Sequence, residues 1–269
     1  MNNLISIDRE KCIDCQKCVG ICPRHIFQRG EDVSGKQSPQ VMQNLIEDCI
    51  HCGHCVCICP TSAIISNDLT PENSMKLDSS KLPTFEQFSM LVKQRRSIRK
   101  YKKDAVDEKQ LSELLDLMRW APTARNRLPL RWTIVNSWET VHEVGQMFVD
   151  EFRGDPKYSS IVQEWEQGVD EIHRGAPCLI FVTVPADYRW LQDASIAIET
   201  MDLAATALGL GACWAGLFIN FVKDNQLVRH KLEIPDDELV CGALLLGYPD
   251  NEIYEKYPYR PKCPVTMIQ

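Results

Sequence analysis

Residues 12–23 read CIDCQKCVGICP, and residues 49–60 read CIHCGHCVCICP. Both segments have the spacing C-x2-C-x2-C-x3-C-P, and the second repeats the first 37 residues later, from Cys12 to Cys49. Nine of the 13 cysteines of the chain lie between residues 12 and 59. No export signal is visible and the long remainder is poor in cysteine, so the cluster favours metal binding over a disulfide framework.

The spacing of the two runs predicts two 4Fe-4S clusters. Three cysteines separated by two residues each can hold three corners of a cubane, and the fourth, before the proline, reaches the other cluster. The expected ligands are Cys12, Cys15, Cys18 and Cys59 for the first cluster, and Cys49, Cys52, Cys55 and Cys22 for the second. Structural zinc is the alternative, but paired C-x2-C knuckles would leave the third cysteine and the x3-C-P ending unexplained.

Other side chains near the cysteines need no ligand role, because eight thiols suffice for eight iron corners. Cys57 has no counterpart in the first run, where Gly20 takes its place, and we expect it to be a small buried side chain. We expect His25, His51 and His54 to be solvated or to lie behind the ligands.

From Ile5 to Ile65 the chain resembles the bacterial two-cluster ferredoxins, including both halves of their internal duplication. The resemblance implies that this part transfers electrons. It implies short flanking strands at residues 6–7 with 26–27 and at residues 45–46 with 64–65, and short helices after each third cysteine.

Length and composition predict a globular protein of two domains. The chain has 269 residues, against about 150 for an average domain, with 44% hydrophobic and 25% charged residues. A net charge of −7 disfavours nucleic-acid binding. The apolar stretch Ala194–Leu217 is broken by Glu199 and Asp202, so we expect a buried helix rather than a membrane span. The N-terminus has no basic and apolar export pattern, and we expect a cytoplasmic protein.

Composition also predicts where the domains meet. Residues 66–83, SNDLTPENSMKLDSSKLP, are rich in turn-forming residues. We expect a ferredoxin domain at residues 1–66, a linker at 67–83 and a second domain at 84–269.

The second domain is predicted to have an α+β fold. Thr84 with Gln87, and Asp107 with Gln110, have the pattern of helix starts, and Pro122 ends the second of these helices. Apolar runs predict strands at 132–135, 178–184 and 239–246, separated by helices at about 138–150 and 192–209.

A phosphate site is suggested by residues 95–99, RRSIR, where guanidinium groups and a hydroxyl lie within five residues. The chain has no Gly-x-Gly-x-x-Gly after a strand and no Walker loop. As a bare pattern, a basic run at the end of a helix is also typical of a solvated face.

Over about residues 84–269 the chain resembles the nitroreductase family. The matching segments, in order, are RRSIR (95–99), APTARNRLP (121–129), GLGACWAG (209–216) and GYP (247–249), followed by Arg260. The sequence departs from the family at residues 128–130, which read LPL where Gln-Pro-Trp is usual. The resemblance implies an α+β homodimer that binds FMN at the subunit interface.

The resemblance also implies roles for individual residues. The FMN phosphate and pyrimidine edge would be held by Arg95, Arg96, Ser97 and Arg99, joined at the phosphate by Arg260 and Lys262. The flavin of the other subunit would be reached by Pro122, Thr123, Ala124 and Asn126. The backbone of Ala215 and Gly216 would approach the flavin ring.

Catalytic side chains remain unassigned, because the sequence has no Ser/His/Asp order and no paired carboxylates of note, and a flavin carries its own chemistry. Trp214 and Phe218 could line the substrate face or pack in the core. His173 could face the site or be solvated, and Cys178, Cys213, Cys241 and Cys263 are not expected to form redox disulfides.

The predicted function is electron transfer from a ferredoxin or NAD(P)H through two clusters to FMN, and then to a small electrophile such as a nitro compound, quinone or activated alkene. Two alternatives stay open at this point. One is a carrier that delivers electrons to a protein partner, and the other is a flavin dehydrogenase that runs in the reverse direction.

Overall fold

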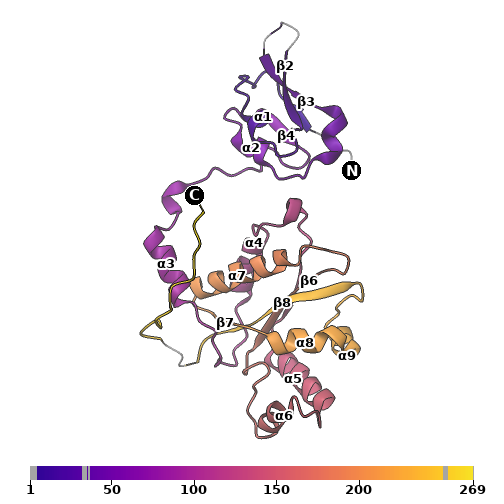
Figure 1. The fold of residues 1–269 in the computed structure, drawn as a ribbon, viewed down its shortest axis with the longest axis vertical. Helices are drawn as coiled ribbons and strands as arrows, with labels where there is room; N and C mark the ends of the chain where they lie inside the picture. The colour runs from indigo at the N-terminus through magenta and orange to yellow at the C-terminus, as the bar shows by residue number, and fades with distance from the viewer. Residues whose placement is uncertain (1–4, 32–34, 36, 251–253, 269) are drawn as a thin grey trace. The chain divides into compact units, whose positions relative to one another are not determined.

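The computed structural model describes residues 5–31, 35, 37–250 and 254–268. The chain divides into two units: Met1–Leu82 with Thr123–Arg127, and Pro83–Pro122 with Leu128–Gln269 (Figure 1). The outer ends of the expected domains, residues 1–4 and 269, lie outside the described residues. The expected boundaries at residues 66 and 84 stay predictions. The sequence does not predict that Thr123–Arg127 belongs to the first unit.

The first unit is built from short elements around a small core. Its elements are β1 (Ile5–Ile7), α1 (Lys17–Ile21), β2 (Phe27–Glu31), β3 (Gln37–Val41), the 3-10 helix η1 (Gln43–Asp48), α2 (His54–Ile58) and β4 (Ile64–Ser66). Strand β1 pairs antiparallel with β4, and β2 pairs antiparallel with β3. The two helices begin one residue before each third cysteine, close to the predicted positions.

The predicted strand pairing in this unit is wrong. Residues 6–7 pair with 65 and 64 at the end of the second repeat, and not with 26–27. Phe27 pairs instead with Val41 in a local hairpin, and residues 45–46 lie in η1. The physical reason is the core: exchange of strands between the repeats lets Ile5 and Ile64 be buried together with Phe27.

The duplication is visible in the backbone as well as in the cysteines. Three residues of each run adopt a left-handed conformation at positions 37 residues apart, which for a non-glycine residue costs roughly 1–2 kcal/mol. The pairs are Asp14 (φ 56°) and His51 (51°), Gln16 (60°) and Gly53 (70°), and His25 (55°) and Ser62 (56°). Both cysteine loops therefore follow the same course.

The second unit contains a four-stranded antiparallel sheet with helices. The strands are β5 (Arg131–Val135), β6 (Cys178–Pro185), β7 (Gly211–Trp214) and β8 (Glu238–Gly247), in the order β5-β6-β8-β7. The helices are α3 (Phe85–Gln94), α4 (Glu108–Met118), α5 (Trp138–Phe152), α6 (Ser159–Glu166), α7 (Gln192–Ala207), α8 (Gly216–Asp224) and α9 (Gln226–Lys231). Short 3-10 turns lie at Ser79–Lys81 (η2) and Ala124–Asn126 (η3). The α+β prediction is confirmed.

Helix caps agree with the sequence signals. Thr84 and Gln87 form a reciprocal capping box at the start of α3. The carboxylate of Asp107 accepts hydrogen bonds from the backbone N–H groups of Lys109 and Gln110 at the start of α4. Helix α4 ends at Met118, before Pro122, as predicted.

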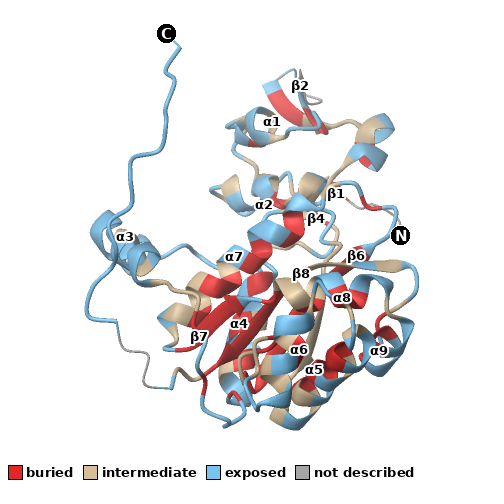
Figure 2. Cartoon of the chain, turned by 60° about the horizontal axis from the view of Figure 1, so that its bottom comes forward, coloured by how far each residue is buried: buried red, intermediate tan, exposed pale blue. Residues whose placement is uncertain are grey.

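Strand β6 is covered on both faces by helices (Figure 2). Ile180 and Val182 pack in a cluster that includes α4 and α7, whereas Leu179 and Phe181 pack in a cluster that includes α5 and α8. The apolar run of this strand therefore reflects burial on both sides, although its neighbours are antiparallel.

The predicted buried helix over Ala194–Leu217 is correct only as far as Ala207. Gly209, at φ 77°, ends α7 through hydrogen bonds of the kind found at helix C-termini, including Leu210 N–H to the Ala205 carbonyl at 2.9 Å. The next residues form β7. No helix of the described residues has the length and apolar character needed to cross a bilayer.

Candidate functional site

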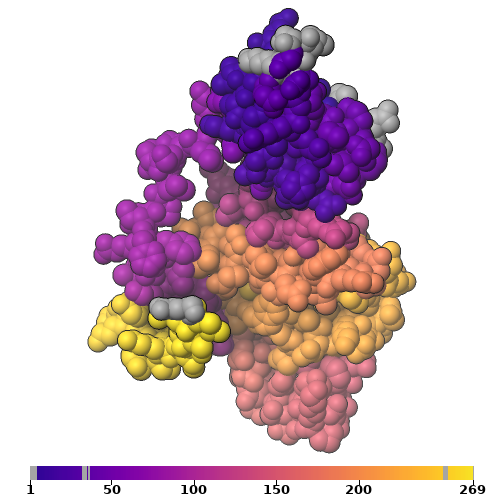
Figure 3. Space-filling model, turned by 45° about the horizontal axis from the view of Figure 1, so that its top comes forward, coloured from indigo at the N-terminus to yellow at the C-terminus, as the bar shows by residue number. Residues whose placement is uncertain are grey.

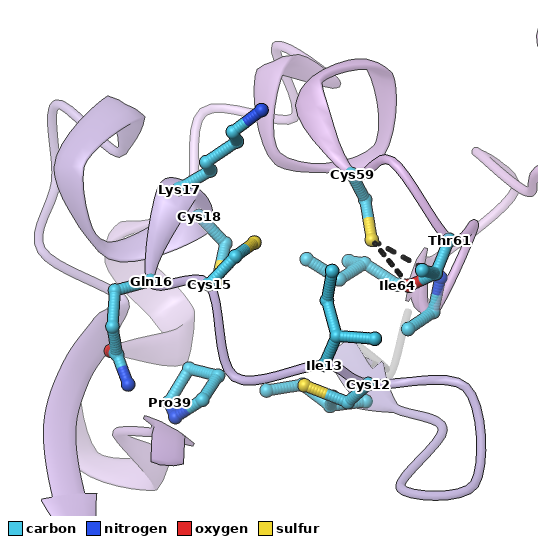
Figure 4. A pocket seen from close by; sticks show the side chains of 12 residues that line it. Cys12, Ile13, Cys15, Gln16, Lys17, Cys18, Pro39, Cys59, Thr61 and Ile64 are labelled. Carbon is cyan, nitrogen blue, oxygen red and sulfur yellow. Dashed lines mark hydrogen bonds between the residues drawn. The ribbon is translucent and has the colours of Figure 1, made fainter. Parts of the chain in front are cut away.

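The first unit contains two hollows, each lined by four cysteines. The first is lined by Cys12, Cys15, Cys18 and Cys59 (Figure 4), and the second by Cys22, Cys49, Cys52 and Cys55. The two hollows are similar in size. The structure brings the eight cysteines together in the two sets that the spacing predicts, with one member of each set contributed by the other run.

The cysteines that cross between the repeats are held in equivalent ways. The Ile26 N–H donates to Cys22 Sγ at 3.4 Å, and the Ala63 N–H donates to Cys59 Sγ at 3.2 Å. Burial raises the pKa of Cys59, but hydrogen bonds from Ala63 and its neighbours outweigh it and the pKa is lowered. For Cys55 burial dominates and raises the pKa to about 12. A thiolate there needs a compensating positive charge, which iron supplies.

The thiols surround a hollow and do not converge on one point. Among the described residues, no group of three or more His, Cys, Asp or Glu side chains could hold a single metal ion. All 13 cysteines are free thiols, so no disulfide competes for them. This arrangement fits cubane clusters, whose corners lie apart, better than the tetrahedral zinc site considered as the alternative.

Two expectations around the cysteines have different outcomes. Cys57 is exposed, so its prediction as a buried side chain is wrong. In α2 the preceding Val56 is the buried residue, which leaves Cys57 on the outer side of a short helix. The three histidines are exposed, as expected for solvated positions, and His51 Nδ1 lies 2.5 Å from Asn67 Nδ2.

Gln16 is a residue of the first hollow that sequence reasoning missed. It lines the hollow beside Pro39 (Figure 4), and both polar atoms of its amide are buried without a hydrogen-bond partner among the described residues. Its counterpart in the second run is Gly53. Both positions have a left-handed backbone, which glycine adopts more easily than glutamine. A glutamine where the other repeat has glycine is the signal that could have identified this residue.

The segment Thr123–Arg127 belongs to the first unit, although its neighbours in the chain belong to the second. Asn126 Nδ2 donates hydrogen bonds to the carbonyl oxygens of His51 at 2.9 Å and Ile50 at 3.3 Å. These carbonyls lie between Cys49 and Cys52 in the sequence. The resemblance assigned Asn126 to a flavin, and the structure shows its amide on the second cysteine loop.

In the second unit, residues 95–99 connect α3 to the sheet. The Ile98 N–H donates to the Ala212 carbonyl at 2.9 Å, next to a parallel bridge between Ser97 and Ala212. A Cβ at Gly211 would lie 2.8 Å from the Ile98 side chain, so only glycine permits this approach. The RRSIR segment is thereby fixed against the edge strand β7.

The guanidinium groups of this segment have different environments. Arg95 Nη1 forms an ion pair with Asp202 Oδ2 at 2.9 Å. Arg96 donates to the carbonyls of Lys93 and Arg95, and Arg99 donates to the carbonyl of Ser97. The other carboxylate oxygen of Asp202 is buried without a partner in the part of the chain that the structure describes. Burial raises the pKa of Asp202, while Arg95 lowers it less strongly.

Arg95→Ala is expected to lower the free energy of unfolding by about 2 kcal/mol, because it leaves a buried carboxylate without its charged partner. The loss should shrink as the pH falls through the raised pKa of Asp202, since a protonated carboxyl needs no cation. Urea denaturation at several pH values measures both. In the double variant Arg95→Ala/Asp202→Asn part of the stability should return, and a strictly additive loss would contradict the pairing.

The turn from β7 into α8 contains the other predicted residues. The Ala215 N–H donates to the Ala243 carbonyl at 3.0 Å and is therefore not available to a ligand. Gly216 begins α8, where the first N–H groups have no partner within the helix. Trp214 is 48% exposed, whereas Phe218 is fully buried, so core packing is the correct alternative for Phe218 only.

Three further predicted residues lie elsewhere. His173 is buried, without a hydrogen-bond partner for either ring nitrogen among the described residues, so the solvated position is wrong and a position facing the site stays a prediction. Burial lowers its pKa to about 4. Arg260 and Lys262 are exposed in the segment after β8. This segment runs beside α3 (Figure 3), with Lys93 Nζ 5.7 Å from the centre of the Tyr257 ring.

Two four-cysteine hollows are followed in the chain by an antiparallel sheet that helices cover and that has an arginine-rich segment at its edge. The hollows are typical of an iron-sulfur protein. Comparison with known families specifies it further. The nitroreductase family profile matches residues 92–248, and the profile of the 4Fe-4S dicluster domain matches residues 11–63. The chain belongs to the nitroreductase family and carries a 4Fe-4S dicluster domain before the family's own domain.

Relatives of known name and structure are similar over most of their length. A provisionally named NADH dehydrogenase/NAD(P)H nitroreductase of Methanothermobacter thermautotrophicus is 29% identical over 164 residues, which are 59% of this chain and 75% of that protein. The 4-nitrobenzoate reductase of Pseudomonas putida is 25% identical over 204 residues, covering 62% and 87%. The crystal structure of a nitroreductase with bound FMN from Bacteroides fragilis is 26% identical, with a TM-score of 0.57, covering 67% and 98%.

Proposed function

We propose that the protein reduces a small electrophile with electrons that pass through two 4Fe-4S clusters to FMN. The observation that supports this most is the presence, in one chain, of two complete four-cysteine hollows and a nitroreductase-family domain. The eight cysteines that line the hollows are the proposed cluster ligands. When bound, the clusters supply one electron at a time, and FMN supplies hydride chemistry.

The proposed FMN site lies around the RRSIR segment and the start of α8. The guanidinium group of Arg96 donates to the carbonyls of Lys93 and Arg95, and it can turn from these carbonyls to a phosphate at little cost. Arg99 belongs to the same proposed phosphate site. The unpaired Asp202 oxygen can accept from a hydroxyl or N–H of the bound molecule. Ser97 and Arg95, the backbone of Gly216, and Arg260 with Lys262 complete the proposed set.

We further propose that the second unit acts as a homodimer. Helix α3 is amphipathic, yet none of its residues is buried in the single chain, and Phe85 is 86% exposed. Val265, Met267 and Ile268 in the C-terminal segment are more than three-quarters exposed as well. Apolar surface of this extent is typical of an interface. The proposed roles of Pro122, Thr123 and Ala124 toward the partner's flavin depend on this dimer.

The electron donor and the acceptor are part of the proposal. We propose a reduced ferredoxin as the donor to the clusters, with NAD(P)H reacting directly at FMN as the second route, and nitro compounds, quinones or activated alkenes as acceptors. The relatives named for nitroreductase activity support a nitro compound first. A cytoplasmic location stays a prediction of the sequence.

Cofactor content tests the proposal. Protein purified without oxygen is expected to contain about eight irons and eight sulfides per chain, together with about one FMN. Chemical iron and sulfide analysis and flavin absorbance after denaturation measure this directly. About two zinc ions per chain without iron would overturn the cluster assignment, and full iron without flavin would favour a carrier that serves a protein partner.

A further inference from the structure

We propose that the cluster held by Cys49, Cys52, Cys55 and Cys22 is the one that exchanges electrons with the flavin, and that Asn126 couples it to the flavin domain. The observation is the pair of hydrogen bonds from Asn126 Nδ2 to the carbonyls of His51 and Ile50. All atoms of this contact lie in the first unit. The inference rests on the proposed function, in which both cofactors are bound.

Asn126 contacts the second of two loops that have a similar backbone course. The first cysteine loop repeats the backbone course of the second, as the paired left-handed residues show. The segment Thr123–Arg127 nevertheless binds the loop between Cys49 and Cys52. An electron path with a fixed order requires that the two clusters differ in what they contact, although their loops are alike.

The backbone on both sides of the contact is in an unfavourable conformation. Arg125, Asn126 and Leu128 have φ values of 55°, 54° and 49°, and His51 has 51°. Asparagine tolerates this region better than most residues, but arginine and leucine do not. Several residues with a strained backbone close together are typical of functional sites. Here the strained segment holds the Asn126 amide against the loop between Cys49 and Cys52.

The segment is covalently continuous with the second unit on both sides, at Pro122 and Leu128. The proposed route for an electron from the second cluster runs from the ligand loop, across the hydrogen bonds of Asn126, into the backbone that continues to the flavin domain. Asn126 acts as a positioning residue in this route. Two such one-electron transfers reduce the flavin, which takes up protons from solvent, and the cluster returns to its oxidised state.

Rapid-freeze EPR on the full-length holoprotein tests the order of the carriers. Fully reduced protein is mixed with p-benzoquinone, which takes two electrons and two protons at the flavin, and the clusters then refill the flavin. Cys15→Ser and Cys52→Ser assign the EPR signals of the first and second cluster. We expect the second cluster to be reoxidised before the first. Reoxidation of the first cluster before the second would overturn the inference.

Asn126→Ala tests the coupling, and Asn67→Ala is its matched control because Asn67 also contacts His51 but belongs to the segment that follows β4. We expect Asn126→Ala to slow reoxidation of the second cluster at least tenfold, and Asn67→Ala to leave it unchanged. In flavin-free protein, Asn126→Ala should alter the EPR signal of the second cluster only. Equal rates in wild type and Asn126→Ala, or a change confined to the first cluster, would contradict the role of Asn126. Clusters that never pass electrons to flavin in the wild type would instead refute the proposed function.

Discussion

Cys15→Ser and Cys52→Ser are each expected to abolish reduction of the flavin by a reduced ferredoxin. Each substitution removes a thiol from one of the two hollows, and thiolate ligands set both the assembly and the potential of a cluster, over a range of about −700 to +450 mV. If a cluster is lost, or if its reduction potential changes greatly, electrons can no longer pass from the ferredoxin to the flavin. Anaerobic stopped-flow spectroscopy of the flavin absorbance measures the rate.

The same variants provide their own control, because the flavin site shares none of the cysteines in the hollows. Flavin reduced chemically in either variant should still react with a nitro compound or quinone at the wild-type rate. Equal rates with the reduced ferredoxin in the wild type and in both variants would show that the clusters are not the path. Direct reduction by NAD(P)H would then be the preferred route.

Arg96→Ala is expected to weaken FMN binding by at least about tenfold, since a charge-assisted hydrogen bond to a phosphate contributes roughly 1.5–3 kcal/mol. The Arg96 guanidinium donates to the carbonyls of Lys93 and Arg95, which are close to it in the chain, so its loss should leave the fold intact. Fluorescence titration of the flavin-free protein with FMN measures the dissociation constant.

Arg119→Ala is a suitable control for Arg96→Ala, because Arg119 is an exposed arginine that pairs with Asp116 at the end of α4. It removes the same charge without touching residues 95–99. Cluster content should be unchanged in both variants. Normal FMN binding by both Arg96→Ala and Arg260→Ala would mean that the phosphate site lies elsewhere.

The features that the sequence predicted correctly are those in which local chemistry decides the structure. Cysteine spacing determines which thiols can meet around one hollow, and the prediction placed Cys22 and Cys59 in opposite sets, where the structure also has them. The caps at Thr84 and Asp107 depend on side chains within one turn, and the apolar run of β6 reflects burial on both faces.

The features that the sequence did not predict depend on contacts between distant residues. The pairing of residues 6–7 with 64–65, and not with 26–27, is decided by a core shared between the repeats. The ion pair of Arg95 with Asp202 joins residues 107 positions apart, and the contact of Asn126 with His51 joins residues 75 positions apart. Nothing in the spacing of either pair indicates a contact.

A chain that joins a dicluster domain to a flavin domain can be explained by the number of electrons that each cofactor carries. A 4Fe-4S cluster passes one electron, whereas reduction of a nitro compound, quinone or alkene requires pairs. FMN accepts electrons singly and delivers them in pairs. Two clusters and one flavin in the same chain would therefore form a converter from one-electron donors to two-electron chemistry.

The most direct test of this converter is an electron count on the anaerobic wild-type protein. Reductive titration should take up about four electrons per chain, one for each cluster and two for FMN. Addition of excess quinone should then reoxidise the cluster and flavin absorbance together and yield about two molecules of hydroquinone per chain. Uptake of only two electrons, or clusters that stay reduced while the flavin is reoxidised, would contradict the account.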